Sequence, residues 1–152
     1  MDIVCDSREH KTELARIQRG LERAGCRTFI SKLYVADYMP LDNARLVIDR
    51  KKDLQELCGN VTQQHERFRE ELIRAQEHDI KIIILCEHGK NIKTLEDVYF
   101  WKNPRLKTSP KATTGKQLYK SLCTIRDRYG VRFEFCEKKD TAKRIMELLA
   151  NE

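Results

Sequence analysis

A short, uninterrupted apolar segment in the middle of the chain sets the strongest limit on the fold. Residues 82–86 read Ile-Ile-Ile-Leu-Cys, the longest apolar run among the 152 residues. The run is far too short for a membrane-spanning helix, which needs roughly 20 apolar residues. Apolar runs of this length are typical of β-strands buried on both faces, which need helices on both sides of their sheet. The sequence therefore predicts an α/β fold.

Helical and strand patterns alternate through the rest of the chain. We expect strands over residues 2–8, 28–36, 45–51, 81–86 and 131–135. We expect helices over residues 10–24, 53–77 (with a break near Gly59), 94–101, 114–129 and from Asp140 onward. Pro40, Asp42 and Asn43 favour a turn, so strands 28–36 and 45–51 should form a hairpin. This order predicts one domain over residues 1–152, with a mixed central β-sheet flanked by helices.

Six cysteines raise the question of disulfides or a zinc site. No two are spaced as Cys-x-x-Cys, and four stand in or beside apolar stretches: Cys5, Cys58, Cys86 and Cys136. Free cysteine behaves as a small hydrophobic residue in such places. The N-terminus lacks the charged and apolar regions of a signal peptide. We therefore expect a cytoplasmic protein whose thiols stay reduced in the core.

Positive charge is concentrated in one part of the chain. The net charge is +6, and residues 98–126 contain seven basic residues but no Asp or Glu. Charged faces that meet only solvent normally mix both signs, so this acid-free segment (residues 98–126) favours contact with a polyanion such as nucleic acid. Residues 102–112 contain two prolines and no apolar period, which indicates a loop. The basic residues are Lys102, Arg105, Lys107, Lys111, Lys116, Lys120 and Arg126.

Acidic and basic side chains share a face on two of the expected strands. Asp6 and Arg8 stand two residues apart, as do Asp49 and Lys51, and this spacing points both side chains of a pair to one side. The hairpin would also bring Asp37 near Asp49. Converging carboxylates repel unless a cation lies between them, and hard oxygen ligands suit Mg²⁺ or Mn²⁺. The spacing alone fits either a metal-dependent hydrolytic site or a surface ladder of ion pairs.

Several segments match one nuclease family, in the same order along nearly the whole chain. Residues 4–9 (VCDSRE) resemble the opening Val-x-Asp-x-Arg-Glu of XPF-type nucleases. Residues 35–38 (VADY) resemble their Val-Gly-Asp-Tyr, and residues 48–51 (IDRK) their Glu-Arg-Lys strand. Later matches are Arg67 with Glu71, residues 84–87, residues 114–131 and residues 140–142. The resemblance is to the XPF-type nuclease domain of the PD-(D/E)XK superfamily, and it implies a restriction-endonuclease-like fold.

The resemblance also implies the catalytic residues of a phosphodiesterase. Asp37 and Asp49 would hold a divalent metal, Mg²⁺ or Mn²⁺, with the Arg50 carbonyl as a further ligand. Lys51 would be the catalytic lysine, which acts on the attacking water and on the charge of the phosphate.

Other matching residues would support this site or contact DNA. Asp6 and Arg8 would support the metal ligands and contact the strand that is cut. The residues expected to bind DNA are Arg67, Lys102, Arg105, Lys107, Lys111, Lys116 and Lys120. The sequence leaves open which of three further acids joins the site: Glu9, Asp53 or Glu71.

The chain departs from the family pattern in three positions of the motif region. Asp49 replaces a Glu, Ala36 replaces a Gly, and Gln55 stands where the family usually has an Asp four residues beyond the lysine. No helix-hairpin-helix domain follows within the 152 residues, which implies a stand-alone domain of the phage or bacterial type. The basic residues of the acid-free segment would then bind DNA in place of that domain.

Together these features lead us to expect a metal-dependent, structure-selective DNA endonuclease that cuts branched or Holliday-type junctions, as in DNA repair or recombination. A homodimer is expected, with contacts through residues 114–129 and 131–135, because symmetric resolution of a junction needs two sites. One alternative is a degenerate nuclease fold that serves as a DNA-binding scaffold. Another is an RNA-processing enzyme, although no aromatic stacking motif on a strand supports it.

Overall fold

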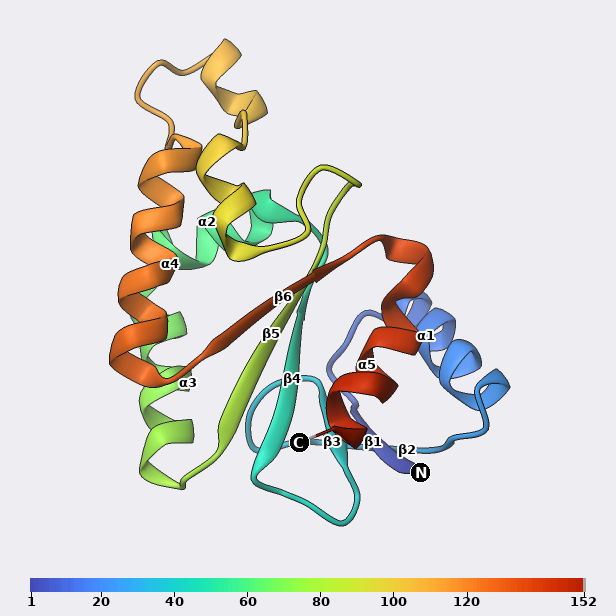
Figure 1. Cartoon of the computed structure of the whole chain (residues 1–152). Coiled ribbons are helices and arrows are strands. Elements are labelled where there is room, and N and C mark those ends of the chain that lie inside the picture. Colours follow the sequence, from blue (N-terminus) through green and yellow to red (C-terminus); the bar gives the residue numbers. More distant parts are fainter. Residues whose placement is uncertain (152) are drawn as a thin grey trace.

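A six-stranded sheet organises residues 1–151, which are the residues described by the computed structural model of the protein (Figure 1). Its order is β2-β1-β3-β4-β5-β6. The strands are β1 (Asp2–Asp6), β2 (Arg27–Ser31), β3 (Tyr38–Pro40), β4 (Leu46–Lys51), β5 (Lys81–Glu87) and β6 (Arg132–Cys136). Only β3 runs antiparallel to its neighbours, so the carboxyl ends of the other five strands lie along one edge.

Helices cover the sheet in two layers. Figure 1 shows α2, α3 and α4 on one side of the sheet and α1 and α5 on the other. The α-helices are α1 (Lys11–Arg23), α2 (Leu54–Val61), α3 (His65–Glu77), α4 (Gly115–Tyr129) and α5 (Thr141–Ala150). Three short 3₁₀ helices are η1 (Leu95–Phe100), η2 (Pro104–Lys107) and η3 (Lys138–Asp140). No helix within residues 1–151 is long and apolar enough to cross a membrane.

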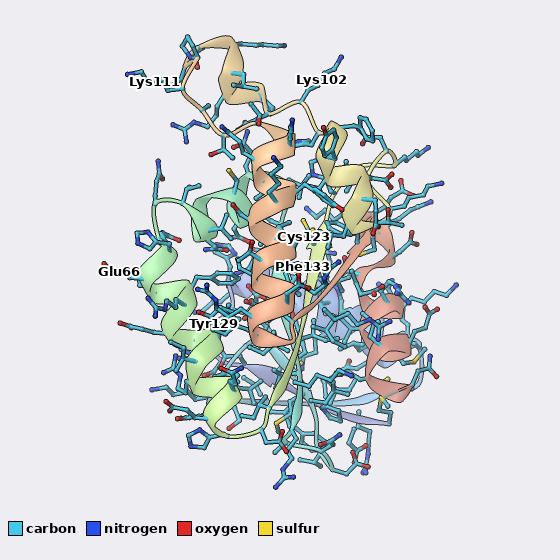
Figure 2. The ribbon with its side chains drawn as sticks, turned by 60° about the vertical axis from the view of Figure 1, so that its left-hand side comes forward. Glu66, Lys102, Lys111, Cys123, Tyr129 and Phe133 are labelled. Carbon is cyan, nitrogen blue, oxygen red and sulfur yellow. The ribbon has the colours of Figure 1, made fainter. Side chains whose placement is uncertain are left out.

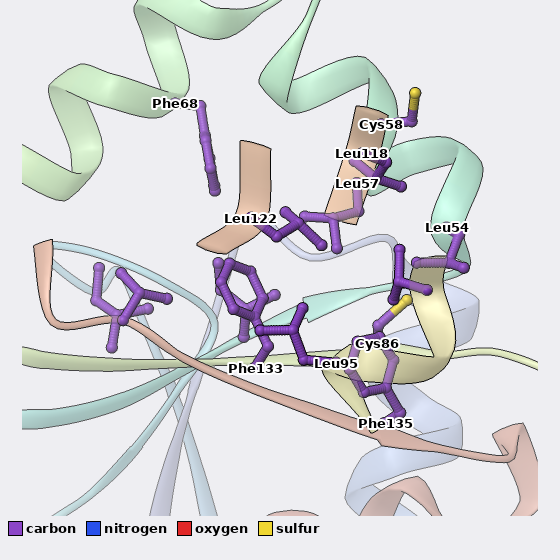
Figure 3. Close-up of a cluster of buried hydrophobic side chains, with 14 of the residues drawn as sticks. Leu54, Leu57, Cys58, Phe68, Cys86, Leu95, Leu118, Leu122, Phe133 and Phe135 are labelled. Carbon is purple, nitrogen blue, oxygen red and sulfur yellow. The ribbon is translucent and has the colours of Figure 1, made fainter. Parts of the chain in front are cut away.

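The apolar run of β5 joins the two hydrophobic cores, as expected for a strand buried on both faces. Ile82, Ile84 and Cys86 belong to the core beneath α2, α3 and α4, while Ile83 and Leu85 belong to the core beneath α1 and α5. Figure 3 shows the first of these cores, with leucines of α2 and α4 packed over phenylalanines of β6. The prediction of a mixed sheet with helices on both sides is confirmed.

The predicted hairpin between residues 28–36 and 45–51 is wrong. The strand in the first segment ends at Ser31 and pairs in parallel with β1 at the edge of the sheet. The partner of β4 is instead the three-residue strand β3, which lies between β1 and β4. The chain leaves the extended conformation because Leu33 N–H donates to the Asp6 carboxylate (2.8 Å) and Ala36 adopts a positive φ of 66°.

Helix boundaries follow the sequence signals closely. The helical region 53–77, expected with a break near Gly59, is two helices, α2 and α3, separated by residues 62–64. Thr114 and Gln117 form a capping box, and α4 ends at Gly130, whose φ is 68°. Asp140 stands at the N-cap position of α5, but its side chain makes no capping hydrogen bond. The 102–112 loop contains the single turn η2.

Candidate active site

The polar residues of the motif region meet at the carboxyl edge of the sheet. Asp6 ends β1, Asp37 directly precedes β3, and Asp49 and Lys51 lie near the end of β4. All four line one pocket of about 550 Å³, whose other wall is formed by the α2–α3 turn and α3. Functional sites of open α/β sheets commonly lie at this edge, because several strand ends converge there. This pocket is the candidate active site.

Backbone hydrogen bonds fix Asp37 between the two motif strands. Its carbonyl accepts from Asp6 N–H (2.7 Å), and its own N–H donates to the Ile48 carbonyl (2.9 Å). The Arg50 N–H donates to its carboxylate oxygen Oδ2 (2.7 Å). The Asp37 carboxylate is therefore held against β4, although residue 37 belongs to neither β3 nor β4.

The Asp37 carboxylate faces that of Asp49. Most of it is surrounded by protein, and this burial, together with the negative charge of Asp49, raises the pKa of Asp37 well above its ordinary value. Without a cation, Asp37 therefore binds a proton more readily than an exposed aspartate does. A divalent metal relieves the same repulsion with both carboxylates ionised, and carboxylate oxygens are suitable ligands for Mg²⁺ or Mn²⁺.

The donor set fits a metal that keeps much of its hydration. No group of three or more His, Cys, Asp or Glu side chains arranged for metal binding is found among residues 1–151. Mg²⁺ is typically held by one or two carboxylates, with waters and substrate phosphate oxygens at the remaining positions. Asp37 and Asp49 meet this requirement, and a ligand role for the Arg50 carbonyl stays a prediction.

Lys51 lies beside the carboxylate pair. Its Nζ is 3.2 Å from Asp49 Oδ2 and 5.5 Å from the centre of the Phe68 ring. Burial lowers the pKa of Lys51, but the charges of Asp49 and Asp37 outweigh it and the net shift is upward. The side chain thus carries a positive charge. It can orient water or balance phosphate charge.

Asp6 and Arg8 form one wall of the pocket. Arg8 Nε lies 3.0 Å from Asp6 Oδ2, and its Nη2 donates to the Leu33 carbonyl (2.8 Å). Asp6 is buried, whereas the Arg8 side chain is 54% exposed. Asp6 also accepts from Leu33 N–H and so holds the 31–37 segment in place, and the exposed part of the Arg8 side chain can contact a ligand in the pocket.

Of the three acids that the sequence left open (Glu9, Asp53 and Glu71), the structure brings Glu71 into the pocket. Its Oε1 accepts from Ala36 N–H (3.2 Å), and burial and the Asp49 charge raise its pKa. The other two acids have structural partners elsewhere: Glu9 pairs with Arg50 (3.2 Å), and Asp53 caps α2 through Glu56 N–H (2.9 Å). The signal in the sequence was the position of Glu71 one turn after Arg67, which also lines the pocket.

The Arg50 side chain points away from the pocket. The side chain is 6% exposed, and its Nη1 lies 2.7 Å from Glu87 Oε1 on the side of the sheet covered by α1 and α5. Thr141 of α5 also donates to Glu87, so this ion cluster ties α5 to β4 and β5. Of the predicted catalytic residues, Arg50 therefore reaches the site through its backbone alone.

The 102–112 loop of the acid-free segment lies beyond the N-terminal end of α4, and Lys116 and Lys120 lie on α4 itself, all outside the pocket. Figure 2 shows Lys102 and Lys111 at this end of the molecule. Six predicted DNA contacts of the segment are exposed, and none forms an ion pair with a carboxylate among residues 1–151: Lys102, Arg105, Lys107, Lys111, Lys116 and Lys120. The structure thus brings together the carboxylates, Lys51, Arg8 and Arg67, and places the remaining cations on a neighbouring surface.

A mixed sheet with carboxylates and a lysine at its strand ends defines a restriction-endonuclease-like fold. Residues 5–148 match the model of the ERCC4 domain, and the chain belongs to this family. The family assignment confirms the resemblance to XPF-type nucleases seen in the sequence. No curated protein sequence matches the chain.

Solved structures show the same fold. XPF from Aeropyrum pernix is similar to this chain with a TM-score of 0.69 and 20% identity, over 99% of this chain and 60% of that one. XPF from Aeropyrum pernix in complex with DNA is similar with a TM-score of 0.68 and 21% identity, over 98% of this chain and 63% of that one. The chain thus spans about 60% of the length of these structures.

Proposed function

We propose that the protein is a metal-dependent DNA endonuclease that hydrolyses phosphodiester bonds. The observation that carries this proposal is the convergence of Asp37, Asp49 and Lys51 in one pocket, where the two carboxylates favour a shared cation. Membership of the ERCC4 domain family supports the same activity.

Each residue has a distinct part in the proposed reaction. Asp37 and Asp49 would hold Mg²⁺ or Mn²⁺, which lowers the pKa of a bound water and stabilises charge on the phosphate. Lys51 supplies a fixed positive charge beside the reacting phosphate, and Arg8 contacts the strand that is cut. Glu71 holds the backbone at Ala36 and thereby fixes the segment that ends in Asp37.

We propose branched DNA, such as the junctions formed in repair and recombination, as the substrate. A similar protein, XPF from Aeropyrum pernix, has been solved in complex with DNA. In this chain, the exposed cations of the acid-free segment have no ion-pair partners among residues 1–151 and lie on a surface that neighbours the candidate active site. They can bind the backbone phosphates of a second duplex arm of a branched DNA. We also propose a cytoplasmic location, at the DNA of a bacterial or phage-infected cell.

A homodimer would place two such sites on one junction. The apolar face of α4 is largely buried in its own core through Leu118 and Leu122, so it offers less contact surface than the sequence suggested. A groove of about 270 Å³ between α3 and α4, lined in part by Ile125 and Tyr129, remains accessible. Light scattering at tens of micromolar, with and without DNA, checks the proposal, and a monomer under both conditions contradicts it.

The central experiment compares cleavage of labelled duplex, flap, fork and four-way junction DNA with EDTA, Mg²⁺, Mn²⁺ and Ca²⁺. Cleavage is expected only with Mg²⁺ or Mn²⁺, and Ca²⁺ is expected to support binding without turnover. Asp49→Asn should abolish cleavage but not binding, whereas Asp42→Asn, in an exposed turn, should cut like the wild type. No cleavage with any metal, and binding indifferent to the charge at residue 49, would instead identify a DNA-binding scaffold.

A further inference from the structure

A second polar pocket, of about 270 Å³, lies on the other side of the α2–α3 turn. One wall comes from α2 and the turn, including Gln55, Gly59 and Thr62. The opposite wall comes from the loop between η1 and α4, including Arg105 and Lys111. We call it the loop pocket.

The chemistry of the loop pocket suits an anion. Its two charged side chains are Arg105 and Lys111, both exposed and without an ion-pair partner among residues 1–151, and no carboxylate lines it. The Ser109 and Thr113 residues add hydroxyl groups to the same wall. Charge-assisted hydrogen bonds from such groups are the usual means of holding a phosphate.

A buried side chain holds the loop in place before any ligand binds. Asn103 is 4% exposed, and its Oδ1 accepts from Gln55 Nε2 (2.8 Å) and from Arg105 N–H (3.0 Å). Its Nδ2 donates to the Thr113 carbonyl (2.8 Å). The side chain therefore joins both ends of the loop to α2, so that little ordering of the loop is needed on binding.

The loop pocket shares a wall with the candidate active site. The end of α2 and the α2–α3 turn together contribute Asn60 and Gln64 to the candidate active site, and Gly59 and Thr62 to the loop pocket. The turn itself is closed by a hydrogen bond from Gln64 N–H to the Gly59 carbonyl (2.9 Å). A strand that crosses this turn can therefore present one phosphate to each pocket.

We propose that the loop pocket binds a backbone phosphate of the same DNA strand that is cut, at a fixed number of nucleotides from the scissile bond. The proposal rests on the proposed nuclease function and adds a second anchor to it. Two phosphates held at separate points would set the register of the strand in the active site, which the metal ligands alone do not define.

The test combines a double variant with a matched control. Arg105→Ala with Lys111→Ala removes both cations of the loop pocket, and Lys11→Ala with Arg19→Ala removes the same charges from exposed positions of α1. Binding is measured in Ca²⁺, so that the result does not depend on cleavage. The loop-pocket variant should flatten the dependence of log affinity on log salt by about 0.9, the slope of one phosphate contact on duplex DNA. The control should leave the slope unchanged.

Phosphate ethylation of the DNA locates the contact. With the wild type, ethylation should interfere with binding at the scissile phosphate and at a second position some nucleotides away. The double variant should lose only the second position. Ser109→Glu, which adds a carboxylate to the pocket and keeps both cations, should have the same effect and guards against a general loss of folding.

The outcomes separate this proposal from the proposed function. A wild type that cuts DNA, with the same interference pattern in the double variant, overturns the loop-pocket proposal and leaves the nuclease function intact. A wild type that never cuts but loses the second position in the double variant overturns the nuclease function alone. Inorganic phosphate can also be titrated and followed by NMR. If it shifts the amide resonances of the loop but ethylation interferes at no second position, the pocket is a site for free anions and the proposal is overturned.

Discussion

The carboxylates of Asp37 and Asp49 face each other across the junction of β3 and β4, and burial and the Asp49 charge raise the pKa of Asp37 well above its ordinary value. When both carboxylates are ionised they repel each other, so the folded protein contains a site that favours a bound cation. A cation bound there stabilises the folded state and has no comparable site in the unfolded chain.

The first prediction is that Mg²⁺ stabilises the wild type but not Asp49→Asn. A ligand present at about 100 times its Kd adds roughly 2.7 kcal/mol to the free energy of unfolding. For a chain of this size that corresponds to a rise in Tm of about 5 °C or more. Thermal unfolding with Mg²⁺ and with EDTA measures the shift. Asp42→Asn is the control, and an equal shift in Asp49→Asn would place the metal elsewhere.

The second prediction is that metal affinity rises with pH. Burial first, and then Asp49, raise the pKa of Asp37 above its ordinary value of 3.8, so protons compete with the metal for this carboxylate. Without metal, a raised carboxyl pKa gives stability that is present at low pH and is lost as the pH rises through the folded pKa. Calorimetric Mg²⁺ titrations from acidic to neutral pH should therefore show increasing affinity and proton release. Asp37→Asn should remove the proton release together with most of the binding.

The third prediction is that Lys51→Met stops cleavage without loss of metal binding. The ammonium lies 3.2 Å from Asp49 Oδ2 but cannot itself bind a cation. Loss of one fixed charge beside a reacting phosphate typically reduces the rate by about 10²–10³-fold. Single-turnover cleavage and Mg²⁺ titration measure the two effects separately. Lys52→Met, at the exposed next residue, is the control, and equal activity of the two variants would show that Lys51 is not catalytic.

The sequence was enough to predict that Asp37, Asp49 and Lys51 lie close together, but not the path that the chain takes to bring Asp37 there. Period-two spacing placed Asp49 and Lys51 on one face because β4 is a regular strand. Asp37 was expected on a hairpin strand, yet it follows a residue with a positive φ, and its position depends on hydrogen bonds to β1 and β4. Glu71 could not be assigned, because its place in the pocket depends on how α3 packs against Ala36.

The fourth prediction concerns Ala36, which stands where the resembling family has a glycine. Its φ of 66° costs an L-amino acid about 1–2 kcal/mol, whereas glycine adopts it freely but loses roughly 0.5–1 kcal/mol of chain entropy on folding. Ala36→Gly should therefore stabilise the protein by up to about 1 kcal/mol. Urea denaturation measures the change. Ala15→Gly, in the interior of α1, should destabilise by about 1 kcal/mol, and the same sign in both variants would contradict a strained Ala36.

The last prediction assigns much of the DNA affinity to the acid-free segment. Lys107, Lys111 and Lys116 are exposed and make no ion pair among residues 1–151, so each is free to neutralise a phosphate. Each phosphate contact contributes about 0.9 to the salt slope on duplex DNA, so replacing all three by Ala should flatten it by up to about 2.7. Fluorescence anisotropy in Ca²⁺ over a range of salt concentrations measures the slope.

The control for this prediction must remove the same charge from the opposite layer of the molecule. Lys11, Lys139 and Lys143 lie on α1, η3 and α5, and replacing them by Ala lowers the net charge equally. Long-range attraction to DNA would fall in both triple variants, but only released counterions at direct contacts change the slope. Equal slopes in the two variants would therefore show that the acid-free segment acts through its overall charge and is not the DNA-binding surface.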